Sequence, residues 1–221
     1  MAARMTKDEL REDPVLERIQ GVIGFIERHG RWLLAGLVGI VVVIVAVVAL
    51  QRSQARSAVE ASQVLAEAQS AYLQGNYMMA ESQLRTIIDE YGGTPAGPAA
   101  RLYLGDALLA LERPAEAIEV YERAAGKLED RELKAAAHRG RGAALEDLKR
   151  HAEASQAYER AGELSSLHEQ SDWLAAARTA LDAGDAGRAE GFIERAEALV
   201  ANPRTEPQLA LLKAKLESAA P

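Results

Sequence analysis

The sequence contains no cysteine, and only 5% of its 221 residues are aromatic. The absence of cysteine excludes disulfides, thiolate metal ligands, a cysteine nucleophile and a lipid-modified N-terminal cysteine. A domain outside the cytoplasm gains by avoiding stray oxidation, but many cytoplasmic domains also lack cysteine. Composition alone therefore does not assign a compartment.

Motifs that carry chemistry are also missing. The four histidines are not spaced as ligands on one helical turn, and HExxH is absent. The run HRGRGAAL (138–145) lacks the Lys-Ser/Thr ending and the preceding strand of a phosphate loop, and no serine lies in a nucleophile elbow. We therefore expect no enzyme, no cofactor, no metal and no small-molecule substrate. The alternative is an enzyme whose site is built from scattered carboxylates.

Charge is distributed unevenly along the chain. Residues 1–31 hold six basic and six acidic residues, whereas the remainder holds 20 basic and 27 acidic residues and so carries the whole net charge of −7. Such a surface repels nucleic acids and anionic lipids. The expected partners are therefore other proteins, with no nucleic acid among them.

One stretch, Trp32–Leu50, has no charge at all and reads WLLAGLVGIVVVIVAVVAL. As a helix it would span about 28 Å, close to the ~30 Å hydrocarbon core of a bilayer. It is longer than the ~7–15-residue apolar region of a cleaved signal peptide, and QRSQARSA follows it in place of a cleavage motif. The stretch 32–50 is therefore predicted to be a transmembrane helix that acts as an uncleaved signal anchor.

The N-terminal tail, 1–31, is predicted to contain a short juxtamembrane helix. Residues 1–13 are polar and expected to be disordered, whereas Asp13-Pro14 is a typical helix start and the amphipathic pattern ends near Gly30. Its apolar face either lies among the lipid headgroups or docks on a partner's membrane helix. A small excess of arginine before the span favours a cytoplasmic N-terminus.

Beyond the span, the chain repeats itself. Four alanines recur at intervals of 37, 37 and 35 residues: Ala80, Ala117, Ala154 and Ala189. A small residue lies twelve positions before each of them and a larger side chain four positions after it. This order is typical of stacked helix hairpins, in which small residues stand where two helices cross and large ones fill the gaps.

The repeat resembles the tetratricopeptide repeat (TPR). The four copies are GNYMMAESQLRTIIDEY (75–91), ARLYLGDALLALERPAEAIEVYERA (100–124), RGRGAALEDLKRHAEASQAYERA (139–161) and WLAAARTALDAGDAGRAEGFIERA (173–196). The predicted fold class is all-α, a single transmembrane helix followed by a TPR-like helical-hairpin solenoid. About four units occupy 51–202, and a capping helix occupies 203–221.

In a solenoid of this kind the first helices of the hairpins line a concave face. Counting back from the repeated alanines gives seven candidate residues for a protein-binding groove: Tyr72, Asp106, Leu109, Arg139, Glu146, Arg178 and Leu181. Arg139 and Arg178 are exceptional in an acidic domain. They either bind a partner's carboxylate or pair within the domain, with Glu146 and its neighbours.

The connections at 92–98, 126–133 and 162–171 are longer than the repeat requires and are either linkers or partner contacts.

The layout also resembles the ancillary subunits of the SecYEG translocon, on the stretch FIERHGRWLLAGLVG (25–39). This resemblance implies a single-pass protein of the bacterial inner membrane, with a cytoplasmic N-terminus and a periplasmic repeat domain. It further implies a non-enzymatic scaffold that works with translocon subunits or a membrane-bound chaperone. The alternative is a scaffold for outer-membrane or division-complex assembly, which YLQGNYMMAESQLRTIIDEYGGTP (72–95) also resembles.

Overall fold

The computed structural model describes residues 14–200 and 202–219, with side chains described at 29–32, 34–200 and 202–218. The predicted disordered stretch 1–13 lies outside the described residues. All regular structure in the described residues is helical, which confirms the all-α class. The helices are α1 (Pro14–Leu73), α2 (Tyr77–Glu90), α3 (Ala96–Ala110), α4 (Pro114–Lys127), α5 (Arg131–Asp147), α6 (His151–Leu164), α7 (Glu169–Asp182), α8 (Ala186–Glu197) and α9 (Glu206–Ala219).

Helix α1 contains the apolar stretch. Within the described part His29–Leu73, an 18-residue window has a mean hydropathy of 3.2 and none of it is buried in the protein. The helix is thus long and apolar enough to cross a membrane. The side chains of the predicted amphipathic face at 14–28 lie outside the described residues. The chain divides into two compact units after Ala55.

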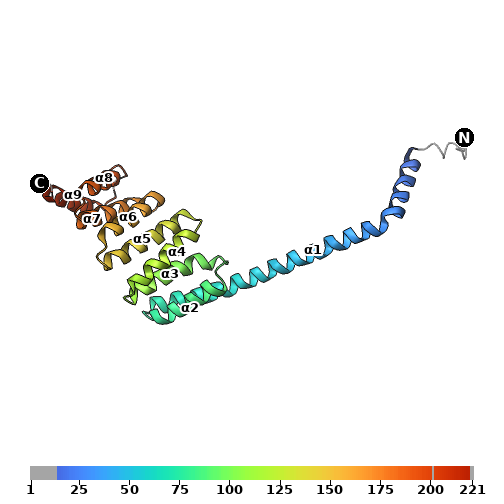
Figure 1. Cartoon of the computed structure of the whole chain (residues 1–221), viewed down its shortest axis with the longest axis horizontal. Coiled ribbons are helices and arrows are strands. Elements are labelled where there is room, and N and C mark those ends of the chain that lie inside the picture. Colours follow the sequence, from blue (N-terminus) through green and yellow to red (C-terminus); the bar gives the residue numbers. More distant parts are fainter. Residues whose placement is uncertain (1–13, 201, 220–221) are drawn as a thin grey trace, which may run out of the picture. The chain divides into compact units, whose positions relative to one another are not determined.

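The second unit is a stack of helix hairpins. Helices α3 and α4, α5 and α6, and α7 and α8 pair as hairpins, each packed on the next (Figure 1). The end of α1 forms the first hairpin with α2, where the Tyr91 hydroxyl donates to Glu60 at 3.4 Å. Helix α9 packs on α7 and α8 and buries Leu212 almost fully. This arrangement is the predicted TPR-like solenoid.

Small residues set the spacing between the helices. All four repeated alanines are fully buried, as are Ala68 and Ala177 in first helices. A Cβ atom placed on Gly105 would lie 2.4 Å from the Tyr121 ring, and one placed on Gly140 would lie equally close to the same ring. Tyr121 therefore packs against two helices at positions that have room for glycine alone.

The turn inside each hairpin uses a left-handed backbone position. These positions recur at the repeat spacing of 37, 37 and 35 residues. Two are glycines, for which the conformation is easy, and two are residues with a Cβ atom, for which it costs roughly 1–2 kcal/mol. They are Gly75 (φ 78°), Glu112 (φ 57°), Lys149 (φ 59°) and Gly184 (φ 80°).

This difference predicts opposite effects of substitutions at equivalent turns. Glu112→Gly and Lys149→Gly should raise the free energy of unfolding by about 0.5 kcal/mol, because the relieved strain exceeds the added freedom of the unfolded chain. Gly75→Ala and Gly184→Ala should lower it by about 1–2 kcal/mol. Urea unfolding of the full-length protein in nonionic detergent, followed by circular dichroism, measures both. A loss in Glu112→Gly equal to that in Gly75→Ala would contradict the assignment.

The connections between hairpins are shorter than expected, because α3, α5 and α7 begin within the predicted loops 92–98, 126–133 and 162–171. The last connection is held to the domain. Ser166 donates its backbone N–H and its hydroxyl to Glu132 at 2.6 and 2.7 Å. These hydrogen bonds lower the pKa of Glu132 to about 2. The connection between α6 and α7 is therefore hydrogen-bonded to Glu132 of α5 and is not a free linker.

Candidate protein-binding groove

A pocket of about 530 Å³ lies on the solenoid between α3 and α5. Three of the seven predicted groove residues, Asp106, Leu109 and Arg139, line this pocket together. The full lining is Ala99, Leu102, Tyr103, Asp106 and Leu109 from α3, Tyr121 from α4, Leu133, Ala136, Arg139, Gly140 and Ala143 from α5, and Tyr158 from α6. We call the surface of the first helices, the end of α1 with α3, α5 and α7, the groove.

Asp106 is bonded to the Tyr121 hydroxyl, which donates to its Oδ1 atom. Burial raises the pKa of Asp106 above its usual value, although the hydrogen bond acts in the opposite direction. Burial and the nearby carboxylate also raise the pKa of Tyr121, so its hydroxyl keeps the proton that it donates. Asp106 thus anchors the tyrosine that α3 and α5 enclose.

Tyr72 lies beside the pocket rather than in its lining. Its ring packs edge-on against Tyr77, with centroids 5.3 Å apart, and against the pocket residue Tyr103 at 6.1 Å. Leu181, at the other end of the groove, is half-buried against the core. The seven predicted residues therefore all lie on first helices, and three of them meet at one pocket.

Arg139 forms a two-pronged ion pair with Asp172 on α7. Its Nε and Nη2 atoms donate to Oδ1 and Oδ2 at 2.6 and 2.7 Å. The Asp172 side chain is only 2% exposed, whereas that of Arg139 is 31% exposed. Asp172 is not evident from the sequence, because an acidic residue in the first turn of a helix is common and gives no sign of a partner 33 residues away.

Glu146 and Arg178 form a second ion pair between α5 and α7. The Arg178 Nη2 atom donates to Glu146 Oε2 at 3.0 Å, Nη1 donates to Oε1, and the Tyr158 hydroxyl donates to Oε2 at 2.7 Å. Burial acts to raise the pKa of Glu146, but these donors outweigh it and the pKa lies below its usual value. Both groove arginines are thus engaged inside the domain.

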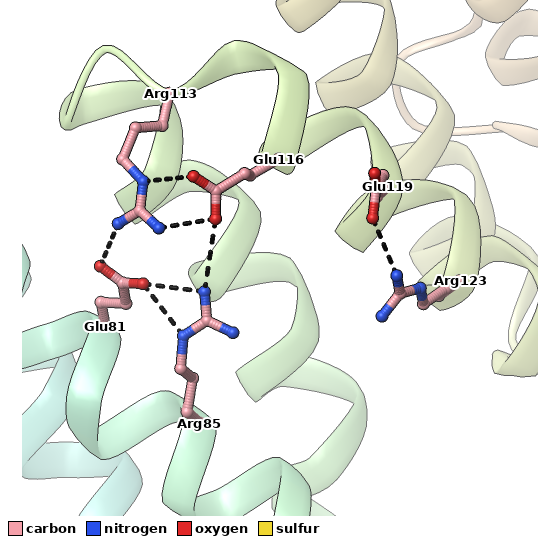
Figure 2. Close-up of polar contacts among 6 residues, drawn as sticks. All are labelled: Glu81, Arg85, Arg113, Glu116, Glu119 and Arg123. Atoms are coloured by element: carbon pink, nitrogen blue, oxygen red, sulfur yellow. Dashed lines mark hydrogen bonds and ion pairs between the residues drawn. The ribbon is translucent and has the colours of Figure 1, made fainter.

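A separate charge network joins the first two hairpins away from this pocket (Figure 2). Arg113 bonds Glu81 on α2 at 2.7 Å and Glu116 on α4 at 2.6 Å, and Arg85 bonds Glu81 at 2.8 Å. Two cations and two carboxylates balance one another here. In the part of the chain that the structure describes, no three His, Asp or Glu side chains are grouped to hold a metal ion.

Comparison with known proteins agrees with this architecture. Residues 65–132 match the model of the tetratricopeptide repeat family. A comparison with curated proteins finds no match. Two crystal structures of a putative kinesin light chain from Podosopora anserina, with nearly identical TPR-like repeats, are similar at TM-scores of 0.55. The singly substituted form is 18% identical and the other 16%, and each comparison covers 72% of this chain and 84% of that chain. At these identities the likeness is one of fold, and the chain has a TPR-like solenoid.

Proposed function

We propose that this chain is a membrane-tethered, non-enzymatic scaffold that binds other proteins through the groove. The observation that carries the proposal is the pocket between α3 and α5, an open site of about 530 Å³ in a fold typical of protein-binding scaffolds. The apolar helix α1 supplies the tether. The acidic charge of the repeat unit supports a protein partner over a nucleic acid.

The proposed location is the bacterial inner membrane, with Trp32–Leu50 as the single span, the tail 1–31 in the cytoplasm and the repeats in the periplasm. The resemblance of residues 25–39 to translocon ancillary subunits supports this arrangement. The partners are then translocon subunits or a membrane-bound periplasmic chaperone. A tether would keep the repeats at the membrane, where a scaffold for emerging chains would act.

Photo-crosslinking in intact membranes tests the proposal. A benzophenone amino acid at Tyr103, in the pocket, should form an adduct that mass spectrometry identifies as a translocon subunit or a membrane-bound chaperone. The same group at Glu119, a 68% exposed site on α4, is the matched control. Adducts from Glu119 alone would contradict groove binding, and an outer-membrane or division protein as neighbour would contradict the translocon assignment.

Protease digestion tests the proposed orientation. Protease added outside spheroplasts should remove the repeats and spare the tail.

A further inference from the structure

Two equivalent junctions of the solenoid differ in chemistry. We call the contact of α3 with α5 the second junction and that of α5 with α7 the third junction. Two ion pairs cross the third junction, Arg139–Asp172 and Glu146–Arg178. The pocket lies at the second junction. The repeat therefore presents a natural comparison between a junction bridged by charges and one left open.

The repeat spacing shows which residues correspond. The residues 37 positions before Arg139 and Glu146 are leucines, and those 35 positions before Asp172 and Arg178 are alanines. Each charged residue of the third junction thus has an apolar counterpart at the second. The counterparts are Leu102, Leu109, Ala137 and Ala143, of which all but Ala137 line the pocket.

Short side chains on α5 leave the pocket open. That wall has three short residues, Ala136, Gly140 and Ala143, beside Leu133 and Arg139. Half-buried Leu102 and Leu109 face it from α3. An apolar side chain placed there would exchange water for carbon contacts on both walls, which is favourable. The pocket thus matches in chemistry a side chain such as Leu, Ile or Phe.

The charged side chains at the pocket already have partners inside the domain. Among the described lining residues only Asp106 and Arg139 are charged; Asp106 is bonded to Tyr121 and Arg139 makes both of its short bonds to Asp172. A carboxylate or ammonium group of a ligand would lose hydration on entry, and the only charged groups that it would meet there already hold partners inside the domain. The pocket therefore disfavours charged side chains of either sign.

We infer that the second junction is a specificity pocket that takes an uncharged, apolar side chain from a segment of a partner protein. The inference rests on the proposed function and names its partner class. It excludes recognition of an acidic segment or a free C-terminal carboxylate through Arg139 and Arg178. The ion pairs of the third junction hold two hairpins together, and the pocket of the second junction binds the partner's side chain.

Fluorescent peptides provide the test with the full-length protein in lipid nanodiscs. Three peptides share an uncharged Ser/Asn/Gln host and differ at two central positions, which are Leu, Glu or Lys. Fluorescence anisotropy should show that the Leu peptide binds about tenfold or more tightly than the other two. Preference for the Glu peptide, or no difference among the three, would overturn the inference, as would failure of the Leu peptide to bind.

Transfer of the charged pair supplies the matched variant. Leu109→Glu with Ala143→Arg places the Glu146–Arg178 pair at the second junction and should weaken Leu-peptide binding about tenfold in a variant that circular dichroism shows to be folded. Glu119→Gln with Arg123→Gln, at an exposed pair on α4, should leave binding unchanged. If the first variant does not fold, Ala136→Leu narrows the pocket without adding charge and should weaken binding similarly. Full binding by the folded pocket variant would overturn the inference.

The same measurements separate this inference from the proposed function. If Tyr103 crosslinks to a partner in membranes but the peptides show no apolar preference, groove binding stands and the pocket specificity fails. If the Leu peptide binds through the pocket but Tyr103 finds no membrane partner, the specificity stands and the proposed scaffold role fails. The two results depend on different probes and can fail independently.

Discussion

Replacing Arg139 with alanine should lower the free energy of unfolding by about 2–4 kcal/mol, because Asp172 would be left nearly buried without its cation. The Asp172 side chain is 2% exposed and receives both short hydrogen bonds from Arg139. Removing one member of such a pair costs far more than the pair contributes as a whole. The value lies below that for a fully enclosed pair, since Arg139 itself is 31% exposed.

The matched control is Arg123→Ala, which breaks an ion pair of similar length on α4. Arg123 and Glu119 are 74% and 68% exposed, so the loss should be about 0–0.5 kcal/mol. Arg178→Ala should fall between them, because Glu146 is 20% exposed and keeps its bond from Tyr158. Urea unfolding in detergent measures all three. Equal losses in Arg139→Ala and Arg123→Ala would show that Asp172 does not depend on Arg139.

This ordering affects how binding experiments are designed. Substituting glutamate at Arg139 and Arg178 would test partner binding and solenoid stability at once, since both side chains brace α5 against α7. Loss of a crosslink in that variant could then result either from weaker partner binding or from a destabilised solenoid. Substitutions at Leu109, Ala136 and Ala143 leave both ion pairs in place, because these residues line the pocket and take no part in the ion pairs.

Sequence periodicity predicts the parts of the fold that depend on contacts repeated in every unit. The spacing of Ala80, Ala117, Ala154 and Ala189 locates the helix crossings, and all four are fully buried. Such positions are predictable because each hairpin places the same constraint on the same residue. The positions of the seven candidate groove residues on the first helices follow for the same reason, because they are counted from those alanines.

Features specific to one unit are harder to predict. Asp172 pairs with Arg139 across two helices, and no local pattern connects residues 33 positions apart. Glu112 and Lys149 adopt the conformation that Gly75 and Gly184 adopt, although neither residue type indicates it. The pocket lies at the second junction, where Leu109 and Ala143 occupy the positions that the charged residues Glu146 and Arg178 occupy at the third junction. Only the comparison of two equivalent junctions in space identifies it.

The tightest crossing should also be the most sensitive to a single methyl group. Gly105→Ala and Gly140→Ala should each lower the free energy of unfolding by about 1–3 kcal/mol, because the added Cβ would lie 2.4 Å from the Tyr121 ring. The ring cannot move aside easily. Tyr121 is 1% exposed, and its hydroxyl is bonded to Asp106.

Gly191→Ala in α8 is the matched control, since a Cβ there meets no atom within 4 Å. It should raise the free energy of unfolding by about 0.5–1 kcal/mol, the usual gain of alanine over glycine inside a helix. Combining Gly140→Ala with Tyr121→Leu tests the cause. If the ring is the obstacle, the added loss from Gly140→Ala should fall by more than about 0.5 kcal/mol in the leucine background. An undiminished loss would mean that another contact keeps the two helices apart, and the enclosure of Tyr121 would not explain the glycines.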